Sequence, residues 1–179
     1  MKKVFDNYVD QLIFDKTFTF KDDSTLMSGK IPFVMFPAKA MATFVQETSL
    51  EMGNSRLNEI AYEAGVMVAD EFIEKLNWSG VPATVKMSGI IKMLKVMGFG
   101  FIHMQKWNIQ ENQVDMQVNK HPVIEAAVEL FGRNELVCGF YMAISSAHFH
   151  KELGIENCQF KSVKCISKGD GCCEWVYGL

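Results

Sequence analysis

The most informative stretch of the chain runs Cys165-Ile166-Ser167-Lys168-Gly169-Asp170-Gly171-Cys172-Cys173. Its Lys-Gly-Asp-Gly segment is typical of a turn that reverses a strand, so we expect Cys165 and Cys173 to face each other across a closing hairpin. A third thiol, Cys138, lies upstream at the start of an apolar helical run. Cysteine thiolates are ligands that zinc prefers, so this pattern predicts a metal site.

The sequence leaves the fourth ligand of such a site open. Zinc is usually held in a tetrahedron, and the candidates are Cys158, Cys172, a nearby histidine and water. Cys172 is disfavoured because neighbouring strand residues point to opposite faces, so it does not share a face with Cys173. The alternative interpretation is that these thiols are buried and bind nothing, since free cysteine behaves as a small apolar side chain.

Length and composition indicate an ordinary globular protein. The chain has 179 residues, of which 49% are hydrophobic, and this suffices for one domain with a sizeable core. We expect an N-terminal extension over 1–25 and a ligand-binding domain over 26–179. The net charge of −3 without a basic stripe argues against a nucleic-acid partner.

The number of cysteines and the hydropathy of the chain indicate the cellular compartment in which the protein works. Five cysteines are an odd number in a chain too large to need disulfides, so metal binding or buried thiols are favoured. Acidic residues interrupt the segment after Met1-Lys2-Lys3 where a secretory signal would need an apolar run. No run approaches the length of a membrane span, and we therefore expect a cytoplasmic protein.

The order of periodic segments predicts an α+β fold, with an antiparallel sheet packed against a helical layer. Helices, a hairpin, further helices and a final hairpin follow one another. Ala61, Ala64 and Gly65 form a small-residue patch that lets another element approach closely, and we expect helix 57–76 to be a dimer contact. The expected elements are a strand at 31–36, helices at 37–53, 54–76, 81–97, 122–131 and 140–153, and strands at 101–109, 114–118, 158–166 and 173–177.

A strand with mixed polarity is the leading candidate for ligand contact. By period two, Phe101, His103, Gln105 and Trp107 share one face, where His103 and Trp107 could hold a phenolic or carbonyl group. The alternative is that this face meets solvent. The further candidates for the wall of a ligand pocket are Met93, Met97, Phe99, Phe140 and Tyr141.

The histidines do not suggest catalysis. His148 and His150 are two apart on a helix and do not share a face, so we expect at least one at the surface, while His121 is expected in a loop. None makes a convincing pair with a cysteine or a carboxylate, and we assign no catalytic residue.

Three stretches of the chain carry a resemblance to a known family. They are 57–65, ending in Tyr-Glu-Ala-Gly, then Val137-Cys138-Gly139-Phe140, and finally 165–175, which follows the pattern C-x-x-x-G-D-x-x-C. Together they resemble the 4-vinyl reductase (V4R) domain family over roughly residues 26–177. That family is related to the sensor domains of aromatic-responsive regulators and, in fold, to subunits of the TRAPP trafficking complex.

The resemblance implies a fold of the NO-signalling and Golgi-transport ligand-binding type, a buried hydrophobic ligand, a homodimer and a structural zinc. The family's zinc thiols correspond to Cys138, Cys165 and Cys173. Its members often also have a glutamate three residues before the first hairpin cysteine, where this chain has Ser162. That departure puts a complete zinc site in question.

Three functional hypotheses follow. The first is a non-catalytic module that binds a small hydrophobic molecule and reports to a separate output protein. The second is an enzyme or enzyme accessory, since the family is named after tetrapyrrole vinyl reduction and an open metal site could bind water. The third is a scaffold whose pocket is permanently filled by lipid.

Overall fold

The computed structural model describes residues 19–20, 26–28, 31–34, 36–75, 78, 80–96, 98–108, 113–134, 136–155 and 158–177. The chain divides between Phe36 and Pro37 into two compact units, each of which is described by itself. The predicted boundary after residue 25 stays a prediction.

The first unit contains a small antiparallel meander. Its strands are β1 (Thr19–Phe20), β2 (Leu26–Ser28) and β3 (Ile31–Phe33), in the order β1-β2-β3. Pro32 lies in β3, which among the described strands pairs with β2 alone, and this fits a residue that cannot donate to a ladder. The strand ends at Phe33, earlier than the expected Phe36.

The second unit contains the helices, which follow the predicted pattern closely. They are α2 (Ala38–Met52), α3 (Asn54–Lys75), α4 (Ala83–Val96), α5 (Pro122–Phe131) and α6 (Leu136–Leu153). Pro37 and Gly53 bound α2, and Gly53 takes a φ of 88°, which glycine adopts readily. The helix expected from Phe140 begins four residues earlier, where Asn134 Oδ1 accepts a hydrogen bond from Leu136 N at 3.2 Å.

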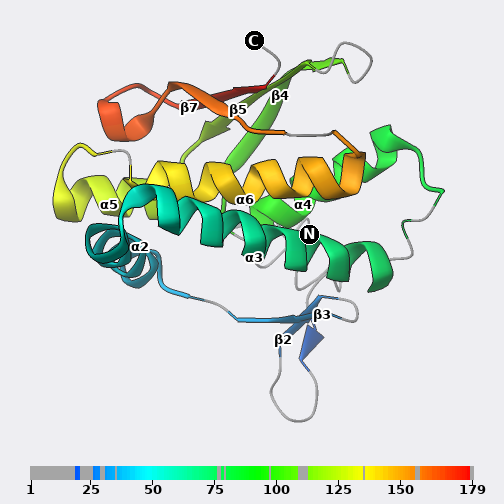
Figure 1. Ribbon diagram of the computed structural model, residues 1–179, viewed down its shortest axis with the longest axis horizontal. Helices are drawn as coiled ribbons and strands as arrows, with labels where there is room; N and C mark the ends of the chain where they lie inside the picture. The colour runs from blue at the N-terminus through cyan, green and yellow to red at the C-terminus, as the bar shows by residue number, and fades with distance from the viewer. Residues whose placement is uncertain are drawn as a thin grey trace, which may run out of the picture. The chain divides into compact units, whose positions relative to one another are not determined.

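α3 and α6 lie side by side and run in the same direction (Figure 1). A Cβ atom on Gly65 would lie 2.8 Å from Ala147 Cβ and 3.1 Å from the Ile144 carbonyl oxygen, so the helix backbones approach very closely there. The small-residue patch therefore works as predicted, but its partner is α6 of the same chain. α6 thus covers the buried side of α3, and the dimer contact expected through helix 57–76 stays a prediction.

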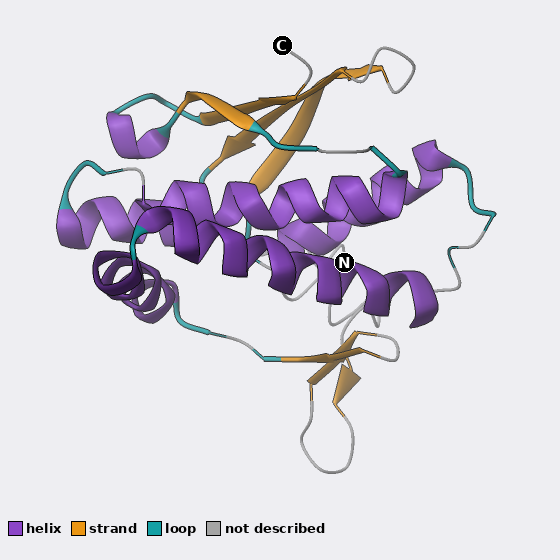
Figure 2. Ribbon diagram, in the orientation of Figure 1, coloured by secondary structure: helices purple, strands orange, loops and turns teal. Residues whose placement is uncertain are grey.

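Four strands form an antiparallel sheet in the order β4-β5-β7-β6 (Figure 2). Their bounds are β4 (Phe101–Asn108), β5 (Gln113–Asn119), β6 (Lys161–Lys164) and β7 (Cys173–Tyr177), with a 3₁₀ turn, η1 (Ile166–Lys168), before β7. The buried residues of β5 alternate along the strand, as period two predicts.

One face of the sheet packs on α6, and the core lies between them. Phe149 of α6 makes edge-to-face contacts with Trp107 of β4 and with Phe160, at centroid distances of 6.3 and 5.0 Å. The α+β expectation is confirmed. None of the helices in the described part of the chain is long and apolar enough to cross a membrane.

Candidate functional site

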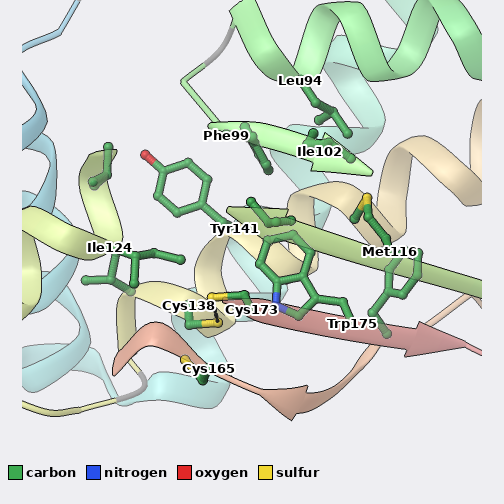
Figure 3. Packing of buried hydrophobic residues seen from close by; sticks show 14 of the residues in the cluster. Leu94, Phe99, Ile102, Met116, Ile124, Cys138, Tyr141, Cys165, Cys173 and Trp175 are labelled. Atoms are coloured by element: carbon green, nitrogen blue, oxygen red, sulfur yellow. Dashed lines mark hydrogen bonds between the residues drawn. The ribbon is translucent and has the colours of Figure 1, made fainter. Parts of the chain in front are cut away.

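The three cysteines predicted to bind metal converge in the core. Cys138 lies in the first turn of α6, Cys165 follows β6 and Cys173 begins β7 (Figure 3). Their sulfur atoms all lie within 4.8 Å of one another, and the Cys138–Cys173 separation is 4.0 Å. A disulfide would need about 2.05 Å, whereas sulfurs in a tetrahedron around zinc at ~2.3 Å lie about 3.8 Å apart. The cluster is therefore close enough to bind a metal ion.

The Lys-Gly-Asp-Gly turn holds Cys165 in place through its backbone. The Cys165 carbonyl accepts hydrogen bonds from Lys168 N at 2.9 Å and from Asp170 N at 3.2 Å. In return, Asp170 Oδ2 accepts a bond from Cys165 N at 2.8 Å. Gly169 takes a left-handed φ of 101°, and a Cβ there would lie 2.8 Å from the Arg133 guanidinium carbon. Glycine suits this turn on both counts.

Hydrogen bonding distributes the protons unequally among the thiols. The neighbouring thiols of Cys138 and Cys173 lower the pKa of Cys165, whereas interaction with Cys165 and Cys173, together with burial, raises the pKa of Cys138. A divalent cation bound to the three sulfurs would release their thiol protons, because metal ligation requires thiolates.

Other candidate ligands lie outside the three-sulfur group. Within the described residues, the group contains neither Cys158 nor Cys172. Ser162, at the family's glutamate position, donates to the Lys164 carbonyl at 3.2 Å. His121 Nδ1 accepts from Ile124 N at 3.4 Å, and His121 is not part of the three-sulfur group.

The candidate ligand residues on β4 do not share one face. Phe101 is 52% exposed and His103 is exposed, whereas Trp107 packs against the core. The register shifts between Met104 and Lys106, so Gln105 is an extra residue, a β-bulge. The expectation of a common face is wrong, because a bulge reverses the alternation beyond it. Trp107 packs against the protein interior, whereas Phe101 and His103 point away from it.

Three of the remaining ligand candidates, Phe99, Phe140 and Tyr141, form an aromatic group beside the thiols, with Phe140 partly buried. Tyr141 meets Phe99 edge-to-face at 4.8 Å, His121 at 4.4 Å and Phe140 at 5.3 Å between ring centroids. His121 lies in the loop between β5 and α5, as expected, and it caps α5 from a fully buried position. Met97 and the side chain of Met93 lie outside the described residues.

Sequence reasoning also missed a polar cluster on α6. Ser145 and His148 are fully buried and Glu152 is 2% exposed. His148 Nδ1 and Glu152 Oε1 lie 2.5 Å apart. The signal in the sequence was the spacing of Ser, His and Glu by three and four residues, which places all three on one helix face.

Comparison with known proteins adds fold relationships. No family model and no curated protein matches the chain. Its structure is similar to the phenol-responsive sensory domain of the transcription activator PoxR, solved with phenol, with a TM-score of 0.73, 13% identity, and coverage of 94% of this chain and 88% of that one. It is also similar to a trafficking protein particle complex subunit 3 from Naegleria fowleri, covalently bound to palmitic acid. That match has a TM-score of 0.53 and 16% identity, and covers 78% of this chain and 93% of the other. Identities this low show a shared fold, and membership of the 4-vinyl reductase family stays a prediction.

Proposed function

We propose that this protein is a binding module for a small hydrophobic, aromatic-type ligand and that it carries a structural zinc ion. The observation that carries the proposal is the fold similarity to a phenol-responsive sensory domain over 94% of the chain. A buried aromatic group around Tyr141, next to the thiol cluster, supports it. The role is sensing or delivery by a cytoplasmic homodimer to a separate output protein.

Zinc is proposed because the donor set fits it. Three buried sulfurs with separations near those of a tetrahedral shell favour a soft divalent ion over magnesium or calcium, which prefer oxygen. Cys138, Cys165 and Cys173 would hold the ion, with a fourth position for water or another ligand. Joining α6 to β6 and β7, such an ion would tie the helical layer to the sheet.

Native mass spectrometry with elemental analysis of freshly purified protein tests both parts. We expect one zinc ion and one small apolar molecule per chain. Cys138→Ser should weaken zinc binding by more than the roughly 10–100-fold that loss of an outer-shell partner costs. Cys172→Ser is the matched control, because Cys172 is buried outside the cluster. Wild-type protein that retains no metal after dialysis from excess zinc would refute the zinc site.

The palmitic acid on the trafficking subunit favours a second candidate function, a scaffold carrying a permanent lipid. Intact-mass measurement separates the two. A mass increase of one acyl chain that hydroxylamine removes would support the scaffold, whereas an exchangeable small molecule supports the binding module.

A further inference from the structure

A line of polar side chains runs along one buried face of α6. Ser145, His148 and Glu152 are spaced by three and four residues and therefore lie one above another. Tyr141 extends the line by one further turn toward the thiol cluster. A buried helix face is ordinarily apolar, so this composition calls for a physical explanation.

Three atoms of this line lack hydrogen-bond partners. Ser145 Oγ, His148 Nε2 and Glu152 Oε2 are buried, and none has a partner among the described residues. The other nitrogen of His148 and the other oxygen of Glu152 bond to each other at 2.5 Å. Buried polar groups are nearly always satisfied, because an unpaired one loses its hydration without compensation. Three unpaired polar atoms in adjacent turns of one helix indicate a binding site for a polar group.

Among the residues that the structure describes, none supplies that group. Phe72 of α3 places its ring 6.1 Å from the His148 ring, between centroids. α4, which packs against α6, contributes the buried apolar residues Met87, Ile90 and Leu94. Lys86 of α4 interacts electrostatically with Glu152, whose pKa is raised by burial despite the opposing effects of His148 and Lys86. His148 and Glu152 thus have an aromatic ring and a cation as neighbours, and the three unpaired atoms have no hydrogen-bond partner among the described residues.

We propose that Ser145, His148 and Glu152 form a subsite that recognises a hydroxyl group on the apolar ligand. This inference rests on the proposed ligand-binding function. In this subsite the Nδ1–H of His148 donates a hydrogen bond to Glu152 Oε1, which leaves Nε2 as an acceptor. A hydroxyl donates its proton to Nε2 and accepts the Ser145 proton, so one ligand group pairs with both atoms. Because Ser145 Oγ makes no hydrogen bond to His148, the arrangement serves recognition and not activation of a nucleophile.

A matched pair of probes tests the subsite by calorimetric titration of the full chain. The probes are 4-butylphenol and butylbenzene, which differ only in the hydroxyl. We expect the phenol to bind about tenfold or more tightly, because a site that leaves buried polar groups unpaired discriminates against the analogue without the hydroxyl. Ser145→Ala should reduce that ratio severalfold. The same variant should unfold at a higher urea concentration without ligand, because it removes an unpaired buried hydroxyl.

Ser146→Ala is the control, because the neighbouring Ser146 hydroxyl is already engaged. It donates to the Met142 carbonyl at 2.9 Å and accepts from Phe160 N at 3.1 Å. This variant should unfold at a lower urea concentration and keep the wild-type ratio of probe affinities.

The outcomes separate the two proposals. Equal binding of both probes, or an unchanged ratio in Ser145→Ala, would overturn the subsite and leave the binding module standing. Tighter binding of 4-butylbenzylamine than of 4-butylphenol would overturn the assignment to a hydroxyl. If neither butyl probe binds, the proposed function fails together with the subsite.

Discussion

At the scale of single residues, His121 shows how burial changes chemistry. Its ring is fully buried between Phe99 and Tyr141, and its Nδ1 caps α5. Burial lowers its pKa from 6.5 to about 3, against the smaller opposing effects of a backbone hydrogen bond and Cys165. The folded protein therefore holds His121 neutral where the unfolded chain would bind a proton.

This lowered pKa predicts a loss of stability in mild acid. A folded pKa below the unfolded one contributes stability that is complete above pH 6.5 and declines as the pH falls toward 3. Protonation of His121 in the unfolded chain should lower the free energy of unfolding by about 2 kcal/mol between pH 7 and pH 5. Urea unfolding of wild type and His121→Asn at both pH values measures it, since asparagine can still cap the helix.

The control for this experiment is His103→Asn, at an exposed position on β4. It should keep the wild-type pH dependence, whereas His121→Asn should lose most of it. Equal pH dependence in all three proteins would show that His121 does not carry the effect.

At the scale of elements, the contact between α3 and α6 depends on Gly65. In an isolated helix, replacing glycine by alanine stabilises by about 1 kcal/mol. Here the added Cβ would meet Ala147 Cβ at 2.8 Å and a carbonyl oxygen at 3.1 Å, and neither can swing aside. Overpacking of this kind costs about 1–3 kcal/mol. We expect Gly65→Ala to lower the free energy of unfolding, as urea denaturation will measure.

A double-mutant cycle with Ala147→Gly isolates the steric part. If the clash is the cause, the two changes together should be less damaging than their sum by at least about 0.5 kcal/mol. A Gly65→Ala protein more stable than wild type would contradict the close approach.

The β-bulge in β4 leads to a prediction about deletions. Met104 pairs with Met116, Lys106 with Asp115 and Trp107 with Val114, so removing Gln105 leaves a regular ladder. We expect the deletion to keep Trp107 in the core and to cost about 1 kcal/mol or less, no more than a typical single-residue change. Tryptophan fluorescence and urea unfolding check this expectation.

Deletion of Asp115 is the contrasting control. β5 has no bulge opposite β7 and pairs on both sides, so losing one residue turns its alternating buried residues to the wrong face. This protein should fail to unfold cooperatively. If deletion of Gln105 is equally damaging, the bulge has a structural role beyond setting which residues of β4 face the core.

At the scale of the whole molecule, the described core and the three thiols belong to one compact unit, residues 37–179. A fragment spanning 37–179 should therefore unfold cooperatively and bind zinc with the affinity of the full chain. Circular dichroism and zinc titration measure both properties. If only the fragment 26–179 retains them, the boundary lies where the sequence predicts it, after residue 25.

Much of the fold was predictable because its signals are local. Helices α2, α3 and α5 follow from hydrophobic period together with Pro37, Gly53 and Pro122, which punctuate the chain. The thiol cluster was predictable from a turn motif, because a tight turn places its two flanking cysteines near each other whatever surrounds them.

The sequence alone thus determined the kinds and order of the helices and strands, and it identified the three thiols as candidate metal ligands. Only the tertiary structure decided that Trp107 faces inward, that α3 meets α6 and that His148 and Glu152 are buried. Backbone propensity and side-chain period act over a few neighbouring residues. Which face a bulged strand or a polar helix turns inward depends instead on strand pairing and helix packing across tens of residues.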